Sequence, residues 1–250
     1  MTDMLQTPGR PGLAYHHSPG TGPTIVFLCG YASDMNGTKA LALETWARGQ
    51  GRAFLRFDYA GCGESEGAFE DQTLADWRDD ALRVIDGVVQ GPVVLVGSSM
   101  GGWVMLLVAK ARAEQVQGMV GIAAAPDFTD WGFTEAQKMR MLQDGRLEEP
   151  SLYSDAATVT TRGFWASGEA NRVMIGPIAF DGPVRLLQGQ RDAEVPWERA
   201  PALAALIRSD AVQTVLVKDG DHRLSREGDI ALILHAVQDV LALCSSPSSF

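Results

Sequence analysis

The sequence is poor in the residues from which disulfide frameworks and cysteine-rich metal sites are built. It has three cysteines among 250 residues, at scattered positions, and none of them belongs to a C-x-x-C pair. Apolar runs are short, and none approaches the roughly 18 residues that cross a bilayer. These absences argue against a disulfide-stapled domain and a membrane-spanning helix, and we predict neither a metal nor an organic cofactor.

Positive charge is also scarce. The 21 lysines and arginines are outnumbered by 31 aspartates and glutamates, which leaves a formal net charge of −10. An acidic protein is not attracted to nucleic acid or to anionic membrane surfaces. We therefore expect no nucleic-acid partner and no insertion into membranes.

The first twelve residues contain no recognisable targeting sequence. They contain neither the apolar core of a secretory signal peptide nor the arginine-rich amphipathic face of a transit peptide. An odd number of scattered cysteines is typical of a reducing compartment. Together these features predict a cytoplasmic protein.

Length and composition are those of one globular domain. The chain is 46% hydrophobic and 21% charged, an ordinary balance for a soluble fold. We expect a core formed by residues 12–126 and 181–243, with an inserted lid over residues 127–180. Residues 244–250, rich in serine, are predicted to form a disordered tail because they offer little to bury.

The most informative stretch runs from Pro92 to Trp103 and reads PVVLVGSSMGGW. Four apolar residues suited to a buried strand lead into a match to G-x-S-x-G, and a helical sequence follows. Strand, sharp turn and helix are the context that a nucleophile elbow requires. The turn strains its central residue, so its neighbours must be small, and Ser99 is exposed beside a helix N-terminus. A glycine-rich turn without chemistry is the alternative interpretation.

Buried strands and amphipathic helices alternate along the rest of the chain. The predicted strands cover residues 24–29, 53–57, 93–96, 119–125, 183–187 and 212–217, and residues 12–17 suit an edge strand. The predicted helices cover residues 38–49, 74–85, 103–113, 134–144 and 229–243. This alternation predicts an α/β fold with a mostly parallel central sheet and helices on both faces.

An oxyanion hole is predicted from two backbone N–H groups. Gly30 and Tyr31 directly follow the first buried strand. In hydrolases built on a nucleophile elbow, this early loop supplies one N–H donor and the residue after the serine supplies the other. We therefore assign the two donors to Tyr31 and Met100; an ordinary turn is the alternative for the Gly30 loop.

An acid and a base follow the last two predicted strands. Asp192 comes shortly after residues 183–187, with Glu194 as its competitor, and His222 follows residues 212–217. His235 falls inside the closing helix, and the adjacent pair at positions 16 and 17 is interpreted as surface residues rather than metal ligands. Serine, acid and histidine thus occur in the chain order of an α/β-hydrolase triad.

Each residue type of this triad has a separate chemical purpose. Serine is a poor nucleophile until a base takes its proton, and histidine can take that proton and return it to the leaving group. A buried carboxylate selects the imidazole tautomer and stabilises the imidazolium. Activity is therefore expected to fall on the acid side, as the histidine becomes protonated.

Large apolar residues are concentrated in the predicted lid. A long excursion between two sheet strands is typical of a cover over the edge where such folds bind ligands. We predict that an acyl chain binds beneath it, although packing within the lid itself is an equal alternative for any one residue. The predicted substrate-binding residues are Gly30, Trp131, Phe133, Phe164, Trp165 and Met174.

The whole chain resembles the α/β-hydrolase superfamily. More narrowly, it resembles a branch of acyl-protein thioesterases and acyl-glucuronide esterases that includes a mitochondrial depalmitoylating enzyme and bacterial relatives. The segments that carry this resemblance are residues 30–35, 37–40, 57–65, 97–103, 192, 195–196 and 219–223. The resemblance implies a triad of Ser99, Asp192 and His222. One departure is Cys29, which stands where many members have histidine and leaves the backbone donor intact. A second is the expected lack of a transit peptide, so location is not carried over.

These observations predict a serine hydrolase that cleaves carboxylic esters or thioesters through an acyl-enzyme. The substrate is expected to be a small ester or thioester or an acylated protein. Two alternatives stay open: a non-catalytic small-ligand-binding protein on the same fold, and an acyltransferase. Acyl-chain length, leaving group and oligomeric state are not predicted.

Overall fold

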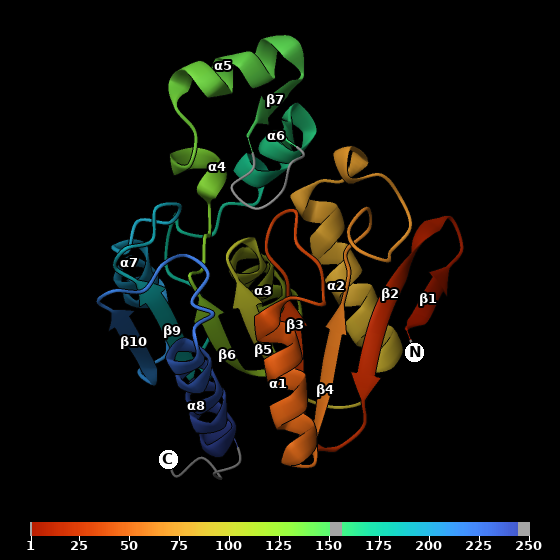
Figure 1. Ribbon diagram of the computed structural model, residues 1–250, viewed down its shortest axis with the longest axis vertical. Coiled ribbons are helices and arrows are strands. Elements are labelled where there is room, and N and C mark those ends of the chain that lie inside the picture. Colours follow the sequence, from red (N-terminus) through yellow and green to blue (C-terminus); the bar gives the residue numbers. More distant parts are fainter. Residues whose placement is uncertain (1, 151–156, 245–250) are drawn as a thin grey trace.

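An eight-stranded sheet forms the centre of the computed structural model, which describes residues 2–150 and 157–244 (Figure 1). The strand order is β1-β2-β4-β3-β5-β6-β9-β10. The strands are β1 (Asp3–Thr7), β2 (Arg10–Ser18), β3 (Thr21–Leu28), β4 (Arg52–Phe57), β5 (Val93–Ser98), β6 (Val116–Ile122), β9 (Val184–Gly189) and β10 (Val212–Val217). From β4 to β10 neighbouring strands are parallel, whereas β1 and β2 add an antiparallel edge.

Helices cover both faces of this sheet. On one face α1 (Thr38–Gly49) and α8 (Glu227–Cys244) lie side by side, in contact with β4 and β6 respectively (Figure 1). On the other face α2 (Leu74–Val88) packs beside α3 (Met100–Ala111), which contacts β5. Because both faces are covered, the central strands are mostly apolar, and residues 93–96 are fully buried. The predicted mostly parallel α/β sheet is confirmed.

The segment between β6 and β9 forms a separate layer above the sheet (Figure 1). It contains α4 (Phe128–Trp131), α5 (Glu135–Asp144), β7 (Arg146–Glu149), β8 (Thr158–Thr161) and α6 (Arg162–Ala170). Strands β7 and β8 pair with each other and not with the central sheet. We call residues 127–180 the lid.

One carboxylate joins the start of the lid to a segment near its end. Asp127 is buried, and its two carboxylate oxygens accept hydrogen bonds from the backbone N–H groups of Val173 and Met174, each 2.8 Å long. Burial raises the pKa of Asp127, while these two N–H donors and Arg172 lower it less strongly. The start of the lid is therefore tied to residues 173–174.

Several predicted boundaries agree with the structure. Helix α1 and strand β10 have the predicted bounds, and α5 begins one residue later because Thr134 is its N-cap. The short helices α6 and α7 (Arg199–Leu206) and the pair β7–β8 were not predicted. The tail prediction fails at residue 244, the last residue of α8, and its remainder, 245–250, lies outside the described residues. Among the helices that the structure describes, none is long and apolar enough to cross a bilayer.

Candidate active site

Ser99 stands at a sharp turn between β5 and α3. Its backbone has φ +55° and ψ −122°, an unfavourable combination for a residue with a side chain. Hydrogen bonds from both sides hold this conformation: Ser99 N donates to the carbonyl of Ile122, and its own carbonyl accepts from the N–H groups of Gly102 and Ala125. The turn is thus fixed by its neighbours.

Gly101 shows why the G-x-S-x-G motif ends in a glycine, two residues after the serine. A Cβ atom on Gly101 would lie only 2.1 Å from the carbonyl oxygen of Leu28 in β3. The first turn of α3 therefore packs directly against the backbone of the adjacent strand. This close approach places the N-terminus of the helix beside Ser99, where its N–H groups favour a developing negative charge.

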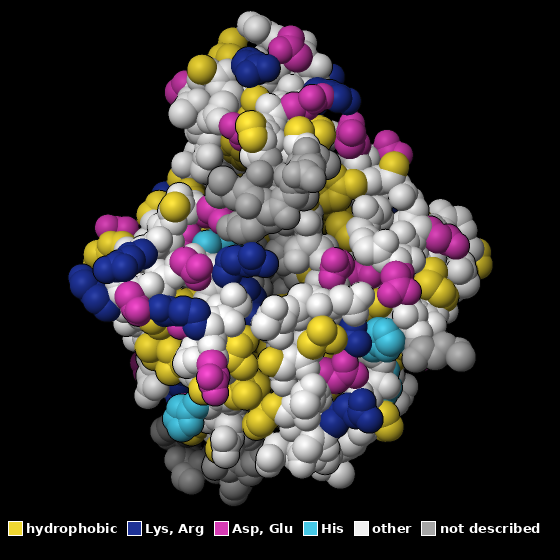
Figure 2. Space-filling view, viewed as in Figure 1, with side chains coloured by type: hydrophobic (Ala, Val, Ile, Leu, Met, Phe, Trp, Pro, Cys, Tyr) yellow, Lys and Arg dark blue, Asp and Glu magenta, His cyan; other side chains and the backbone are white. Residues whose placement is uncertain are grey.

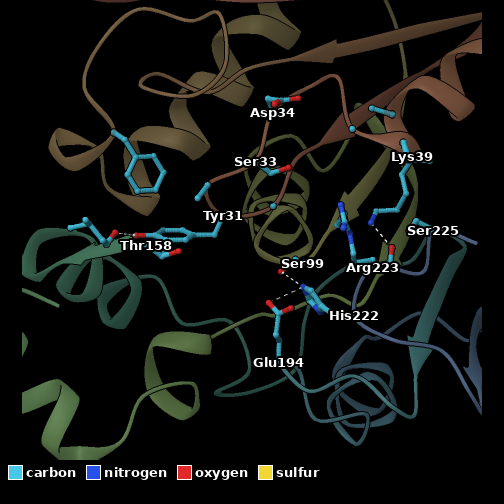
Figure 3. Close-up of a pocket in the computed structure, with 18 of the residues that line it drawn as sticks. Tyr31, Ser33, Asp34, Lys39, Ser99, Thr158, Glu194, His222, Arg223 and Ser225 are labelled. Atoms are coloured by element: carbon cyan, nitrogen blue, oxygen red, sulfur yellow. Dashed lines mark hydrogen bonds and ion pairs between the residues drawn. The ribbon is translucent and has the colours of Figure 1, made fainter. Parts of the chain in front are cut away.

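His222 connects the serine to a carboxylate. Its Nε2 atom lies 3.1 Å from Ser99 Oγ, and its Nδ1 atom lies 2.8 Å from Asp192 Oδ2 (Figure 3 shows the contact with Ser99). The tautomer protonated on Nδ1 satisfies both contacts, since Nδ1 then donates to the carboxylate and Nε2 accepts from the hydroxyl. This arrangement leaves Ser99 next to a base that is already oriented.

Asp192 is held by four donors. Oδ2 accepts from His222 and from Gln188 Nε2, and Oδ1 accepts from the backbone N–H groups of Glu194 and Val195. Its side chain is fully buried. Burial raises its pKa, but the hydrogen bond and charge of His222 and the two N–H groups outweigh that effect, so the pKa lies below its ordinary value. Asp192 is therefore an ionised carboxylate next to the base.

Glu194, the competing acid, occupies a different side of the imidazole. Its carboxylate approaches His222 Nε2 at 3.7 Å, on the side of Ser99, and its side chain is 35% exposed (Figure 3). Its backbone N–H meanwhile supports Asp192. The position that orients the imidazole through Nδ1 thus belongs to Asp192.

The loop after β3 lies against the serine. A Cβ atom on Gly30 would be 3.3 Å from Ser99 Cβ and 3.9 Å from Ser99 Oγ. Tyr31 follows in this loop, and Met100, fully covered, is the first residue of α3. Tyr31 thus lines the same cavity as Ser99, and Met100 directly follows Ser99 in the chain.

A cavity of about 740 Å³ opens between this loop and the lid. Ser99, His222, Gly30 and Tyr31 line it, together with Val159 of β8. Its charged lining residues are Asp34, Lys39, Glu70, Glu149, Glu194 and Arg223. Lys39 Nζ donates to the main-chain carbonyl of Arg223, and burial lowers the pKa of Lys39, with the charge of Arg223 adding to that effect. On the face of the molecule that Figure 2 shows, basic side chains are likewise interspersed with acidic ones.

The structure places the predicted lid residues elsewhere. Gly30 lines the cavity, whereas Trp131, Phe133, Phe164, Trp165 and Met174 are not among its lining residues. Trp131 and Trp165 donate hydrogen bonds to main-chain carbonyls at the start of the lid, and Phe164 is buried in an aromatic cluster. Phe133 and Trp165 contact other lid residues, and Phe164 packs against the core, so the apolar acyl channel expected from this set does not coincide with the cavity.

Two residues near the site were missed in the sequence. Gln188 lies in β9 and contacts Asp192; the signal was a polar side chain shortly after the apolar pair at positions 186 and 187 of this buried strand. Lys39 lies in α1 and lines the cavity, and no role was predicted for it. Among the described residues, no group of three or more histidine, cysteine or carboxylate side chains is arranged to hold a metal ion. His16 instead lies 3.2 Å from the Thr2 hydroxyl.

Comparison with known proteins agrees with this geometry. Residues 25–242 match the model of the alpha/beta hydrolase family. The chain belongs to this family. Within it, the human palmitoyl-protein thioesterase ABHD10, mitochondrial, is 39% identical over 242 residues, which cover 95% of this chain and 79% of the relative.

Two solved structures are similar to this chain over almost their whole length. The alpha/beta hydrolase domain-containing protein 10 from mouse has a TM-score of 0.90 and 37% identity, covering 97% of this chain and 98% of its own. A protein of Agrobacterium vitis S4 has a TM-score of 0.91 and 38% identity, and the match covers 96% of this chain and 98% of that protein. The predicted resemblance to thioesterase relatives in this family is confirmed.

The predicted cytoplasmic location is wrong by the same comparison. The human, orangutan and bovine relatives at 38–39% identity are all named as mitochondrial proteins. The prediction rested on scattered cysteines and on the first twelve residues, and neither feature identifies a compartment.

Proposed function

We propose that this protein is a serine hydrolase that cleaves carboxylic esters or thioesters through an acyl-enzyme, with Ser99 as nucleophile. The observation that carries the proposal is the continuous set of contacts from Ser99 Oγ through His222 to Asp192. A hydroxyl becomes a nucleophile when a positioned base can take its proton, and here the base is itself oriented by a buried carboxylate.

Acylation begins when Ser99 Oγ attacks the substrate carbonyl carbon. Its proton passes to His222 Nε2, and the carbonyl oxygen becomes an oxyanion that the N–H groups of Tyr31 and Met100 stabilise. Asp192 stabilises the resulting imidazolium. The tetrahedral intermediate collapses when the bond to the leaving sulfur or oxygen breaks, and His222 returns the proton to that atom.

Deacylation repeats these steps with water. Water replaces the leaving group, His222 takes one of its protons, and the oxygen attacks the acyl carbon. Collapse releases the carboxylic acid and restores the Ser99 hydroxyl with the proton from His222. Each cycle therefore consumes one water and needs no redox partner.

The names of the relatives support a long-chain thioester as substrate. Those at 38–39% identity are named palmitoyl-protein thioesterases. A cavity of about 740 Å³ is within the size range of small-molecule sites and opens directly onto Ser99. We propose an acylated protein or a small acyl thioester, with the acyl group beside Ser99.

The test is active-site labelling with a fluorophosphonate probe. Ser99→Ala should abolish labelling and lower kcat for p-nitrophenyl esters and acyl thioesters by several orders of magnitude. Ser209→Ala, in the loop before β10, is the control and should behave like the wild type. Failure of the folded wild type to label or to turn over these substrates would reject the hydrolase and favour a non-catalytic ligand-binding protein.

A further inference from the structure

Tyr31 lies at the boundary between the core and the lid. Its ring centroid is 5.1 Å from that of Phe69 and 5.7 Å from that of Trp77, both of which belong to the core. On its other side it is 6.0 Å from Phe128 of α4 and 4.8 Å from Phe164 of α6. Aromatic contacts with two parts of the molecule therefore fix the plane of the ring.

The hydroxyl of Tyr31 reaches further into the lid. It donates a hydrogen bond of 2.7 Å to the main-chain carbonyl of Val159 in β8 (Figure 3). Burial raises the pKa of the phenol, so it keeps the proton that this bond needs. Val159 also lines the cavity, so the bond lies at the wall of the site.

The loop that carries the backbone of Tyr31 lies against Ser99. Gly30, directly before Tyr31, lies against the serine side chain, and Ala32, directly after it, has φ +50°. A residue with a side chain holds such a backbone only when its surroundings enforce it. The loop therefore needs external support, and the phenol ring is placed to give it.

We propose that Tyr31 is a positioning residue that couples strand β8 of the lid to the oxyanion loop, so that the hydroxyl–Val159 bond sets the orientation of the Tyr31 N–H. The inference rests on the proposed function, because it assigns that N–H to the oxyanion. It adds a role for the side chain of this residue that the hydrolase chemistry alone does not require.

The expected signature is a loss in the chemical step that does not depend on the acyl chain. An oxyanion donor acts on the carbonyl oxygen, which is common to all substrates, whereas a pocket wall acts on the chain. Tyr31→Phe removes only the hydroxyl and keeps the ring among its aromatic neighbours. We expect acylation to slow by about twofold to tenfold, which is the size expected for one lost hydrogen bond.

The measurement is the pre-steady-state acylation rate with p-nitrophenyl acetate and p-nitrophenyl octanoate. Tyr59→Phe is the matched control, since Tyr59 is also buried and 5.9 Å from Trp77, but its hydroxyl has no hydrogen-bond partner within the described part of the chain. Tyr31→Phe should slow both substrates equally with little change in KM, and the control should match the wild type. A change confined to KM for octanoate, or no change, would overturn the proposal.

A double-mutant cycle tests the coupling from the lid side. Leu147 of β7 is buried and lies opposite Thr160 of β8, so Leu147→Ala loosens the β7–β8 pair without touching the oxyanion loop. This substitution should slow acylation in the wild-type background and have a smaller effect in the Tyr31→Phe background. Equal effects in both backgrounds would show that β8 and the oxyanion loop are independent.

The two proposals fail in different ways. If Ser99→Ala is inactive while Tyr31→Phe acylates at the wild-type rate, the hydrolase function stands and the coupling is rejected. If the folded wild type neither labels nor turns over, both are rejected. Thermal unfolding of each variant identifies any loss of activity that comes from a loss of fold.

Discussion

Gln188 donates a hydrogen bond from Nε2 to Asp192 Oδ2 over 2.8 Å, the same distance that separates this oxygen from His222 Nδ1. Gln188 is completely buried within β9, and its Nε2 lies 3.3 Å from the carbonyl of Val195 as well. The carboxylate is thus oriented from the interior of the sheet, and the imidazole is oriented by the carboxylate.

Gln188→Leu should therefore weaken both catalysis and folding. It removes one of the four donors to Asp192 and leaves the Val195 carbonyl without this partner. We expect kcat to fall by about tenfold and the free energy of unfolding by about 1.5–3 kcal/mol, the range for a hydrogen bond to a charged group. Ester turnover and urea denaturation measure the two effects. Gln213→Leu, on an exposed position of β10, is the control; equal losses in both variants would contradict the assignment.

Asp192 should make the free energy of unfolding depend on pH at acidic pH, around and below the pKa of an unfolded aspartate. Its pKa in the folded protein is below the value of about 3.9 expected for an unfolded chain. A depressed carboxyl pKa contributes stability that is present above the unfolded pKa and is lost as the pH falls through the folded one. Asp192→Asn removes that contribution, so the stability difference from the wild type should shrink as the pH is lowered from 6 to about 3. Urea denaturation across this series provides the test, and a constant difference would argue against it.

Gly30→Ala should block the oxyanion site. The added Cβ would lie 3.3 Å from Ser99 Cβ, which is tight enough to displace the loop that carries the Tyr31 N–H. Small displacements of reacting groups are costly, and we expect kcat/KM to fall by about 10- to 100-fold. Gly228→Ala, where a Cβ meets nothing within 4 Å, should leave ester turnover unchanged. Wild-type turnover by Gly30→Ala would mean that this loop does not carry the donor.

The three thiols should be unreactive in the native protein. Burial raises the pKa of Cys29 well above its ordinary value, that of Cys62 to about 12 and that of Cys244 to about 11. Since the thiolate is the reactive species, titration with a disulfide reagent at pH 8 should be slow and should reach three thiols per chain after denaturation. Rapid labelling of Cys62 before unfolding would contradict this.

The sheet could be predicted from the sequence because its strands are short, β-branched and bounded by glycine or polar residues. Residues 93–96 and 212–217 are examples, and the loops that follow them bring Ser99 and His222 together because the strands are parallel. Strand β7 reads Arg-Leu-Glu-Glu, which has one buried residue and is stabilised by pairing with β8. Such a polar strand depends on its partner, and its sequence alone does not reveal it.

The lid shows a different limit of sequence reasoning. Trp165 and Phe164 are large and apolar, and such residues suit a substrate pocket and a small packed layer equally well. The structure uses them for packing, and the cavity beside Ser99 is lined by polar loops and by the short pair β7–β8. Composition identifies which side chains are buried, but the direction in which each one points depends on how the short helices of the lid are arranged.

The carboxylate of Asp127 has a consequence for how such a protein can diversify. Asp127 is bonded to residues 173 and 174, so the segment between them is a closed loop. The distance between the two ends of this loop is fixed, whatever the segment contains. The entropy of closing a loop changes slowly with length, by about 0.6 kcal/mol for each doubling. A segment of another length and sequence can therefore replace the insertion while the sheet keeps its stability. If the new segment provides a carbonyl that accepts the hydrogen bond of Tyr31, the range of substrates could change while the proposed catalytic residues stay the same.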